Sequence, residues 1–253
     1  MTGAKTMTKT KYGPIEPRPK VKPKSLLVVP HRSKPLTVAQ FGPNTYINNI
    51  QKMQGDFSCM PKYPQMSFTP ATTSESISVA SYEFEARAKP SIFDLSWLQL
   101  GWGVATSEGY FVNPPKDSQG KPITNEKALK GIKTKKINGI YLGSNDFGFA
   151  PFSTFEQGEQ DSSKFVEGGL ARILEHTEDK KAGKLSVISD PKLYDLGVDV
   201  FEFNRASANP VLIIPVLSSN KDGDCRLYVN GDGRSNLRVG YVFGKLVNKS
   251  QRS

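Results

Sequence analysis

The stretch VDVFEFNRASANPVLIIPVL, residues 198–217, carries the pattern on which the predicted fold depends. Residues 198–203 are rich in the β-branched and aromatic side chains that favour strands. After the turn signal Asn209-Pro210, residues 211–217 are continuously apolar, which is typical of a strand buried on both faces. Pro215 within this run must lie where the sheet needs no backbone donor.

Outward from this stretch, the C-terminal part of the chain repeats short apolar runs separated by turns. Asp222-Gly223 and Asn230-Gly231 supply the positive φ angles that tight hairpins require. The predicted strands are residues 185–189, 198–203, 211–217, 225–229 and 237–243. This spacing predicts a mainly β fold, a β-sandwich or jelly-roll-like arrangement with one or two helices in its connections. An α+β fold is the alternative.

A long strand is predicted further upstream, over residues 76–88. Ile77 and Val79 share one face of such a strand, whereas Tyr82 and Phe84 share the other. The alternation therefore changes phase in the middle, and a bulge or bend is expected there.

Two helices are predicted from apolar residues at helical spacing, over residues 44–54 and 163–178. The second contains Gly168 and Gly169, which lower its helix propensity by about 1 kcal/mol each relative to alanine. The two glycines either weaken this helix or allow another element to approach it closely.

The first 36 residues form a basic, proline-rich segment. It carries nine basic side chains and one acid, so it holds +8 of the formal net charge of +10. Its prolines and mutually repelling lysines favour an extended path. Because lysines outnumber arginines, the segment suits nonspecific neutralisation of phosphate more than base reading. The cations predicted to bind nucleic acid here are Lys5, Lys9, Lys11, Arg18, Lys20, Lys22, Lys24, Arg32 and Lys34. A solubilising or targeting tail is the alternative.

A second basic stretch covers residues 113–136 and contains several prolines and glycines. It is predicted to be a long excursion from the core, which either lines the same nucleic-acid surface or is an exposed loop. Its candidate nucleic-acid contacts are Lys127, Lys130, Lys133, Lys135 and Lys136. We therefore divide the chain into an extended basic arm, residues 1–36, and a single β-rich globular domain, residues 37–253.

No motif in the sequence predicts catalysis or a cofactor. The phosphate loop, the dinucleotide loop, the nucleophile elbow and the metalloprotease helix are absent. His31 and His176 have no cysteine or second histidine beside them, so a zinc site is not expected; His176 is interpreted as a solvated residue at a helix end. The weak candidates for a metal site are Asn220, Asp222, Asp224 and Asp232, whose alternative is two hairpin turns.

Four aromatic residues alternate with leucines in the middle of the chain. This pattern predicts that they belong to the core and do not form a platform for stacking bases. They are Trp97, Trp102, Tyr110 and Phe111.

The sequence also indicates in which cellular compartment the protein is expected. The N-terminus lacks the apolar run of a secretory signal, and Cys59 and Cys225 are too few for a typical secreted protein of this size. The longest apolar run, residues 211–217, is far shorter than the ~20 residues of a spanning helix. We expect a reducing compartment, the cytoplasm or a virion, with no secretion and no membrane partner.

These observations together predict a noncatalytic structural protein whose basic arm meets nucleic acid, RNA in preference to DNA. The architecture is similar to that of small-virus coat proteins, in which a basic arm precedes a jelly roll, and other copies of the chain or partner subunits of a large assembly are then its partners. A noncatalytic RNA-binding subunit of a ribonucleoprotein complex is the first alternative. A β-sandwich hydrolase or carbohydrate-binding module is the second.

Overall fold

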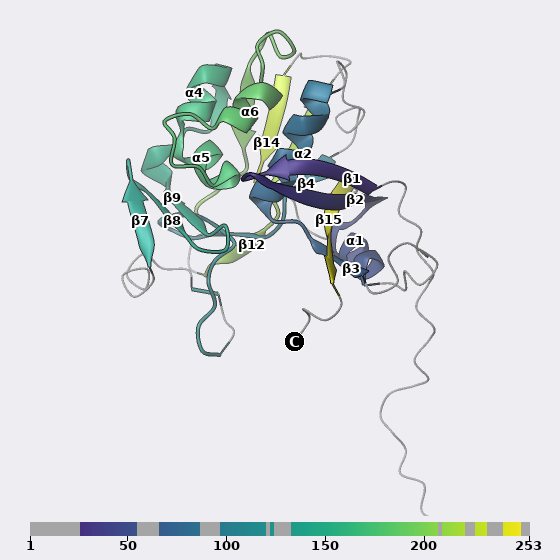
Figure 1. Cartoon of the computed structure of the whole chain (residues 1–253). Coiled ribbons are helices and arrows are strands. Elements are labelled where there is room, and N and C mark those ends of the chain that lie inside the picture. The colour runs from purple at the N-terminus through teal and green to yellow at the C-terminus, as the bar shows by residue number, and fades with distance from the viewer. Residues whose placement is uncertain are drawn as a thin grey trace, which may run out of the picture.

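The computed structural model describes residues 26–54, 66–86, 97–119, 122–123, 133–206, 209–220, 226–231 and 240–248 (Figure 1). In these residues the chain forms two β-sheets and five α-helices. With 41% of residues in strands and 26% in helices, the prediction of a mainly β fold is confirmed. None of the described helices is long and apolar enough to cross a membrane.

The larger sheet has nine strands: β1 (Leu26–His31), β2 (Lys34–Asn44), β3 (Met66–Pro70), β4 (Trp97–Gln99), β10 (Gly158–Gln160), β11 (Val198–Phe201), β13 (Val216–Asn220), β14 (Arg226–Asn230) and β15 (Gly240–Asn248). Their order is β1-β2-β15-β4-β13-β14-β11-β10, and β3 also pairs with β15. The pairs β11–β14 and β15–β4 are parallel. The sheet is therefore mixed, unlike the antiparallel sheets of a jelly roll.

The smaller sheet has six antiparallel strands: β5 (Gly103–Ala105), β6 (Gly109–Val112), β7 (Thr134–Ile137), β8 (Ile140–Gly143), β9 (Gly148–Pro151) and β12 (Val211–Ile213). Their order is β12-β5-β6-β9-β8-β7, so β12 and β7 are its outer strands. The turn between β7 and β8 is Asn138-Gly139, with positive φ at both residues, the sequence that two-residue hairpins prefer.

The helices are α1 (Tyr46–Met53), α2 (Thr73–Ala86), α4 (Ser162–Glu167), α5 (Gly169–Glu175) and α6 (Gly183–Ile188), with a 3₁₀ turn η2 (Phe152–Thr154). Figure 1 shows α2 beside the β1–β2 hairpin and α4, α5 and α6 grouped next to it. Helix α2 contacts β1, α5 and α6, and α5 packs on β9 of the smaller sheet. One hydrophobic core joins α2, α4, α5 and α6 to both sheets, with Leu217, Tyr110 and Ile77 among its fully buried members. Tyr46 and Met53 of α1 belong to a second cluster.

The β1–β2 hairpin incorporates the last part of the basic arm into the larger sheet. Its pairing runs from Leu26 opposite Ala39 to His31 opposite Lys34. The boundary drawn at residue 36 thus falls inside β2, and residues 1–25 lie outside the described part of the chain.

The predicted strand over residues 76–88 is wrong, because residues 76–86 belong to helix α2. Residues 87 and 88 lie outside the described part of the chain. Thr72 and Glu75 form a reciprocal cap: the Glu75 amide donates to Thr72 Oγ1 at 3.2 Å, and the Thr72 amide donates to Glu75 Oε2 at 2.8 Å. This capping box satisfies two amide donors at the helix start. The change in strand alternation that the sequence suggested has another origin. Ile77 and Phe84 are seven residues apart, which is a helical spacing, and the helix is buried on most sides.

The predicted strand over residues 185–189 is also wrong, because the segment forms helix α6. Leu185 and Ile188, three residues apart, are both fully buried. The backbone amides of Lys184 and Leu185 donate to Glu175 Oε2 at 3.1 and 3.2 Å. The carboxylate thereby pairs amides that have no partner within the helix.

Residues 211–217 form two strands in different sheets, where a single strand was predicted. Val211 and Leu212 of β12 are more than half exposed, whereas Val216 and Leu217 of β13 are buried. Pro215 lies between the strands and has no amide to donate, so the chain leaves the smaller sheet there and enters the larger one. The strands predicted at 198–203, 225–229 and 237–243 correspond to β11, β14 and β15, with shifted ends.

Both predicted helices are present, but the second is divided. Residues 44–54 contain α1, capped by Thr45, whose side chain accepts from the Asn48 amide. Residues 163–178 contain α4 and α5, separated by the extended backbone of Gly168. A Cβ atom on Gly169 would lie 2.3 Å from Thr154 Oγ1. Gly169 therefore allows the close approach of another element that the sequence left as one alternative.

Candidate ligand-binding cleft

Two adjoining cavities, with volumes of about 560 and 620 Å³, lie between the start of α2, the β1–β2 turn and the β8–β9 connection. Thr72 and Asn145 belong to the walls of both cavities. We call the combined space the cleft, and its two parts the apolar and the polar cavity. Each part has the size of a site for a small organic ligand.

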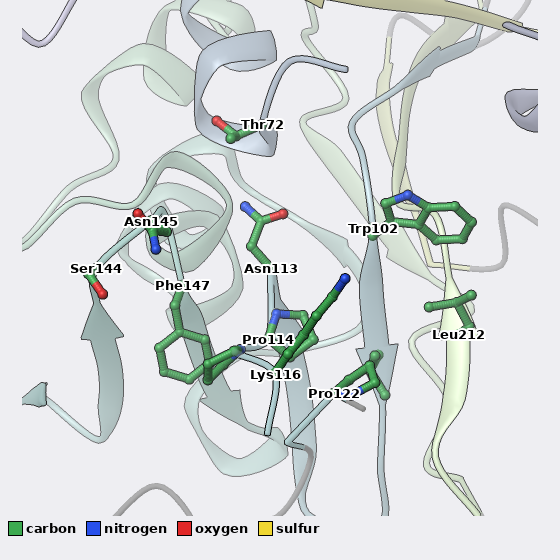
Figure 2. Close-up of a pocket in the computed structure, with 12 residues that line it drawn as sticks. Thr72, Trp102, Asn113, Pro114, Lys116, Pro122, Ser144, Asn145, Phe147 and Leu212 are labelled. Atoms are coloured by element: carbon green, nitrogen blue, oxygen red, sulfur yellow. The ribbon is translucent and has the colours of Figure 1, made fainter. Parts of the chain in front are cut away.

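The apolar cavity has mostly hydrophobic walls with a few amides and hydroxyls (Figure 2). Trp102 and Leu212 lie on one side, and Phe147 lies on the opposite side. Its lining residues are Thr72, Trp102, Val104, Asn113, Pro114, Pro115, Lys116, Pro122, Ser144, Asn145, Phe147 and Leu212. Aromatic and proline surfaces with a few polar groups are typical of a site for a flat organic group.

Trp102 is the accessible aromatic residue of this cavity, with 37% of its surface exposed. Tyr46 packs edge-on against it at 5.0 Å between ring centroids, which holds the indole in place. The prediction that Trp102, Tyr110 and Phe111 are core residues is confirmed for the two buried ones but is wrong for Trp102. Trp97 lies in β4.

The polar cavity is lined by three cations and two acids: Arg32, Lys34 and Lys245 against Glu75 and Asp146. Arg32 Nη1 lies 2.6 Å from Asp146 Oδ1, and Lys245 Nζ lies 2.7 Å from Glu75 Oε1. Lys34 is exposed and has no ion-pair partner among the described residues. One cation of the cavity therefore remains available to an anion.

Arg32 joins segments that are far apart in the sequence. Besides Asp146, its Nη2 contacts Ser74 Oγ at 3.2 Å and His176 Nδ1 at 2.8 Å. Since arginine only donates, His176 Nδ1 must accept, and Nε2 donates to the Gly143 carbonyl at 2.9 Å. This fixes one tautomer of His176 and connects the β1–β2 turn to α2, α5 and the β8–β9 connection.

His31 forms the second polar contact with α2. Its Nδ1 lies 2.7 Å from Ser78 Oγ, which also accepts from Lys184 Nζ at 2.5 Å and donates to the Ser74 carbonyl at 2.9 Å. With the Ser78 proton used in this way, Nδ1 donates and Nε2 keeps its lone pair. Burial, then Lys184 and Arg32, hold the pKa of His31 below its ordinary value. His31 is thus a neutral acceptor on the cavity wall at neutral pH.

Backbone strain is concentrated around the cleft. The described residues include eight non-glycine positions with positive φ. Six of them line the cleft or adjoin its polar network: Arg32, Ser33, Asn113, Asn145, Asp146 and His176. Such conformations cost of order 1–3 kcal/mol each and persist only where the surroundings enforce them. Arg32-Ser33 occupies a two-residue turn where asparagine and glycine are the usual residues. The strain supports a functional role for this region.

Asp146 is the most constrained acid of the cleft, and its side chain is 9% exposed. Thr72 Oγ1 donates to its Oδ2 at 2.5 Å, and Nδ2 of the Asn113 side chain donates to its backbone carbonyl at 3.3 Å. Burial acts to raise the pKa of Asp146, but the Thr72 hydrogen bond and the charge of Arg32 outweigh it and place the pKa below its ordinary value. Asp146 is therefore ionised at neutral pH.

The cleft contains two of the predicted nucleic-acid contacts, Arg32 and Lys34. Lys133, Lys135 and Lys136 lie at or just before β7, the far outer strand of the smaller sheet, and none of them lines the cleft. Lys135 pairs with Glu178 there. The remaining candidates lie outside the described residues: Lys5, Lys9, Lys11, Arg18, Lys20, Lys22, Lys24, Lys127 and Lys130.

Sequence reasoning missed the contact between His176 and Arg32. His176 was interpreted as a solvated helix-end residue, and nothing in the sequence relates it to His31. The helix start at Thr72 did leave a signal, because Thr72-Thr-Ser-Glu75 fits the capping-box pattern.

No group of three or more His, Cys, Asp or Glu side chains within the described ranges is placed to hold a metal ion. Of the weak calcium candidates, Asn220 ends β13, whereas Asp222, Asp224 and Asp232 lie outside those ranges, as do Cys59 and Cys225. Comparison with protein-family models, curated proteins and solved structures finds no match for this chain.

Proposed function

We propose that this protein binds single-stranded nucleic acid, RNA in preference to DNA, without catalysing a reaction, and that the cleft holds one nucleotide. The observation that carries the proposal is the junction of an apolar cavity containing an accessible tryptophan with a cationic cavity. A nucleotide has the same division, with a flat aromatic base at one end and an anionic phosphate at the other.

The base is assigned to the apolar cavity. Stacking of a base on an aromatic side chain contributes about 1–3 kcal/mol and tolerates any base. Trp102 offers such a face, and the side chains of Asn113 and Asn145 offer amides to the edge of the base. Recognition of an unstacked base by these groups is typical of single-stranded RNA binding.

The phosphate is assigned to the polar cavity, where Lys34 has no acidic partner among the described residues and Arg32 and Lys245 add positive charge. Thr72 and Asn145, shared by both cavities, then face the sugar, and their polar groups suit a 2′-hydroxyl. Arg32 and Lys34 are also the last cations of the basic arm, so a strand bound by the arm has a continuation at the cleft.

The proposal is tested by fluorescence anisotropy with end-labelled single-stranded RNA, single-stranded DNA and a duplex, at one fixed salt concentration. We expect the single strands to bind more tightly than the duplex. Trp102→Leu should weaken RNA binding about tenfold, the loss of one stacked base, and Lys34→Gln should weaken it by a smaller factor.

The matched controls are Leu193→Ala and Lys192→Gln, exposed residues that line neither cavity. Both should bind RNA as the wild type does. If Trp102→Leu folds with an unchanged melting temperature and binds RNA equally well, the cleft is not the nucleotide site.

The arm is tested separately through the salt dependence of binding. Replacing Lys20, Lys22 and Lys24 by glutamine in the full chain should reduce the log–log salt slope by about 2, since each phosphate contact on a single strand contributes about 0.7. An unchanged slope would mean that these lysines do not contact phosphate.

Self-assembly into a coat is a second candidate function, supported by exposed apolar residues on the outer strands. Val28 of β1 is 57% exposed and Val211 of β12 is 51% exposed, and exposed edge strands are surfaces for pairing between chains. Light scattering coupled to size-exclusion chromatography should then reveal large particles with bound nucleic acid, and Val28→Glu should reduce their size. A monomer at all concentrations would exclude a coat.

A further inference from the structure

A third cavity, of about 420 Å³, lies away from the cleft, between η2, the junction of α4 and α5, and the β7–β8 turn. Its walls are polar. They consist of Asn138, Ser153, Thr154, Glu167, Gly169, Arg172, Lys180 and Lys181. We call this space the Arg172 cavity.

Arg172 is a buried cation with no carboxylate at ion-pair distance among the described residues. The charge of Asp179 acts on it from farther away. Only 3% of the surface of Arg172 is exposed. Its Nη2 donates to the Glu178 carbonyl at 2.9 Å, whereas its Nε has no acceptor, and no carboxylate forms an ion pair with it among the described residues. Buried charges are normally paired, because an uncompensated one is strongly unfavourable. Arg172 thus lines a cavity while one of its N–H groups, that of Nε, has no acceptor.

Two lysines add to the positive charge of the cavity. Lys181 is 3.4 Å from Glu167 in an exposed ion pair, whereas Lys180 has no ion-pair partner in the described part of the chain. Among the charged side chains that line the cavity, three are therefore cations and one is an acid. The hydroxyls of Ser153 and Thr154 and the amide of Asn138 supply uncharged polar groups on the same walls.

The local backbone keeps this arrangement close-packed. Gly169 begins α5 against η2, where a Cβ atom would lie 2.3 Å from Thr154 Oγ1 and 2.9 Å from Ile140 Cγ2. The absence of a side chain at Gly169 is what lets η2, which carries Ser153 and Thr154, sit against the helix that carries Arg172.

We propose that the Arg172 cavity binds a phosphate group. A planar guanidinium whose Nε–H has no acceptor matches the oxygens of a phosphate, and nearby ammonium groups add positive charge. The inference stands independently of the nucleotide cleft, since no residue is shared between the two sites.

The test is a titration of the full, ¹⁵N-labelled chain with inorganic phosphate, followed by NMR, with sodium chloride at equal ionic strength as the reference. We expect phosphate, and not chloride, to shift the amide signals of Asn138, Ser153 and Gly169. Lys180→Gln should weaken phosphate binding about tenfold, the loss of one charge-assisted hydrogen bond, and Lys192→Gln should leave it unchanged.

Arg172→Gln tests the central residue and should abolish the phosphate-dependent shifts. If this variant does not fold, Lys180→Glu, on an exposed side chain, serves in its place and should also abolish them. Equal shifts with phosphate and chloride, or equal phosphate affinity for wild type and Lys180→Glu, would overturn the proposal. Trp102→Leu should not alter the phosphate titration, so a failure of the nucleotide cleft is distinguishable from a failure of this site.

The source of the phosphate is distinguished by a second ligand, a single-stranded oligonucleotide without terminal phosphates. If it shifts the same three amide signals, the cavity takes a phosphate of a nucleic-acid backbone. If only inorganic phosphate shifts them, the cavity takes a free phosphate.

Discussion

The cleft beside α2 and the Arg172 cavity both place cations against the protein interior, but they differ in how the charge is compensated. In the cleft, Arg32 meets Asp146 and Lys245 meets Glu75. In the Arg172 cavity, the guanidinium meets one backbone carbonyl and no carboxylate within the described residues.

The charged side chains therefore have different roles in the two regions. The paired charges of the cleft hold strained turns and distant segments in one arrangement, because Arg32 bonds to three elements besides its own. Arg172 joins fewer segments, since it donates to one backbone carbonyl and its Nε has no acceptor. Its natural partner is an anion from outside the chain.

Removing Asp146, the acid that pairs with Arg32 in the cleft, should have the largest effect on the free energy of unfolding. Asp146→Ala deprives Arg32 and Thr72 of their common acceptor, and we expect the free energy of unfolding to fall by about 2–3 kcal/mol. This is less than for a fully buried pair, because Arg32 is half exposed. Urea denaturation measures the change, and the exposed Asp195→Ala should stay within about 0.5 kcal/mol of wild type.

The same residue predicts a dependence on pH. A carboxyl whose pKa is lower in the folded than in the unfolded state contributes stability above the unfolded pKa, and this contribution is lost as the pH falls through the folded value. Wild type should therefore lose stability below about pH 4, and Asp146→Asn should lose less over the same range. Parallel curves for the two proteins would contradict the role assigned to Asp146.

Adding a side chain at Gly169, beside the Arg172 cavity, should have the next largest effect on the free energy of unfolding. Gly169→Ala would force Thr154 away from α5, and overpacking of this kind typically costs about 1–3 kcal/mol. Gly183→Ala is the matched control, because no atom lies within 4 Å of the Cβ that it adds. It should stabilise the protein by about 0.5 kcal/mol. A similar midpoint for both variants in urea would mean that the close contact is not maintained in solution.

The helix cap connects the two parts of the cleft, and its loss should have a moderate effect. Thr72→Ala removes the acceptor for the Glu75 amide and the donor to Asp146, so we expect a loss of about 1–2 kcal/mol. Thr72→Ser keeps the hydroxyl and should keep most of the stability. Thermal denaturation of the two variants tests whether the hydroxyl, and not the methyl group, is responsible.

The smallest expected effect concerns His31. Its pKa is lowered by burial and by the neighbouring Lys184 and Arg32, so the folded state binds fewer protons than the unfolded state, and stability rises with pH until the unfolded value of about 6.5 is passed. Lys184→Gln should move the pKa of His31 upward in an NMR titration, whereas Lys192→Gln should not. A pKa that is unaffected by Lys184→Gln would show that the two side chains do not interact.

Local patterns predicted the elements whose neighbours lie close in sequence. Helix α1 and strands β11, β14 and β15 follow from spacing and turn residues. Helix α2 was misread because its serines and alanines weaken the apolar periodicity, although the Thr72–Glu75 capping pattern was present. The division at Pro215 was also recognisable as an interruption, but its consequence depends on a second sheet that the run itself does not reveal.

Local sequence patterns could not predict which residues form the cleft. Arg32, Asp146 and His176 come from a hairpin turn, a strand connection and a helix end, and only the packing of both sheets around α2 brings them together. The predicted arm contributed two of its predicted nucleic-acid contacts, Arg32 and Lys34, because its last part belongs to a hairpin of the larger sheet. Charge counts identified the cations, but they could not indicate which of them have acids beside them.

The pairing of strand β15 affects the order in which the larger sheet can form during synthesis. It pairs with β2 near one end of the chain, with β3, and with β4 in the middle of the sheet. Strand β2 of the β1–β2 hairpin therefore cannot pair with β15 until residues 240–248 have been synthesised. Folds built on such distant pairings form slowly and leave strand edges unpaired meanwhile, so we expect the edge of β2 to stay open to association with other chains until β15 is available.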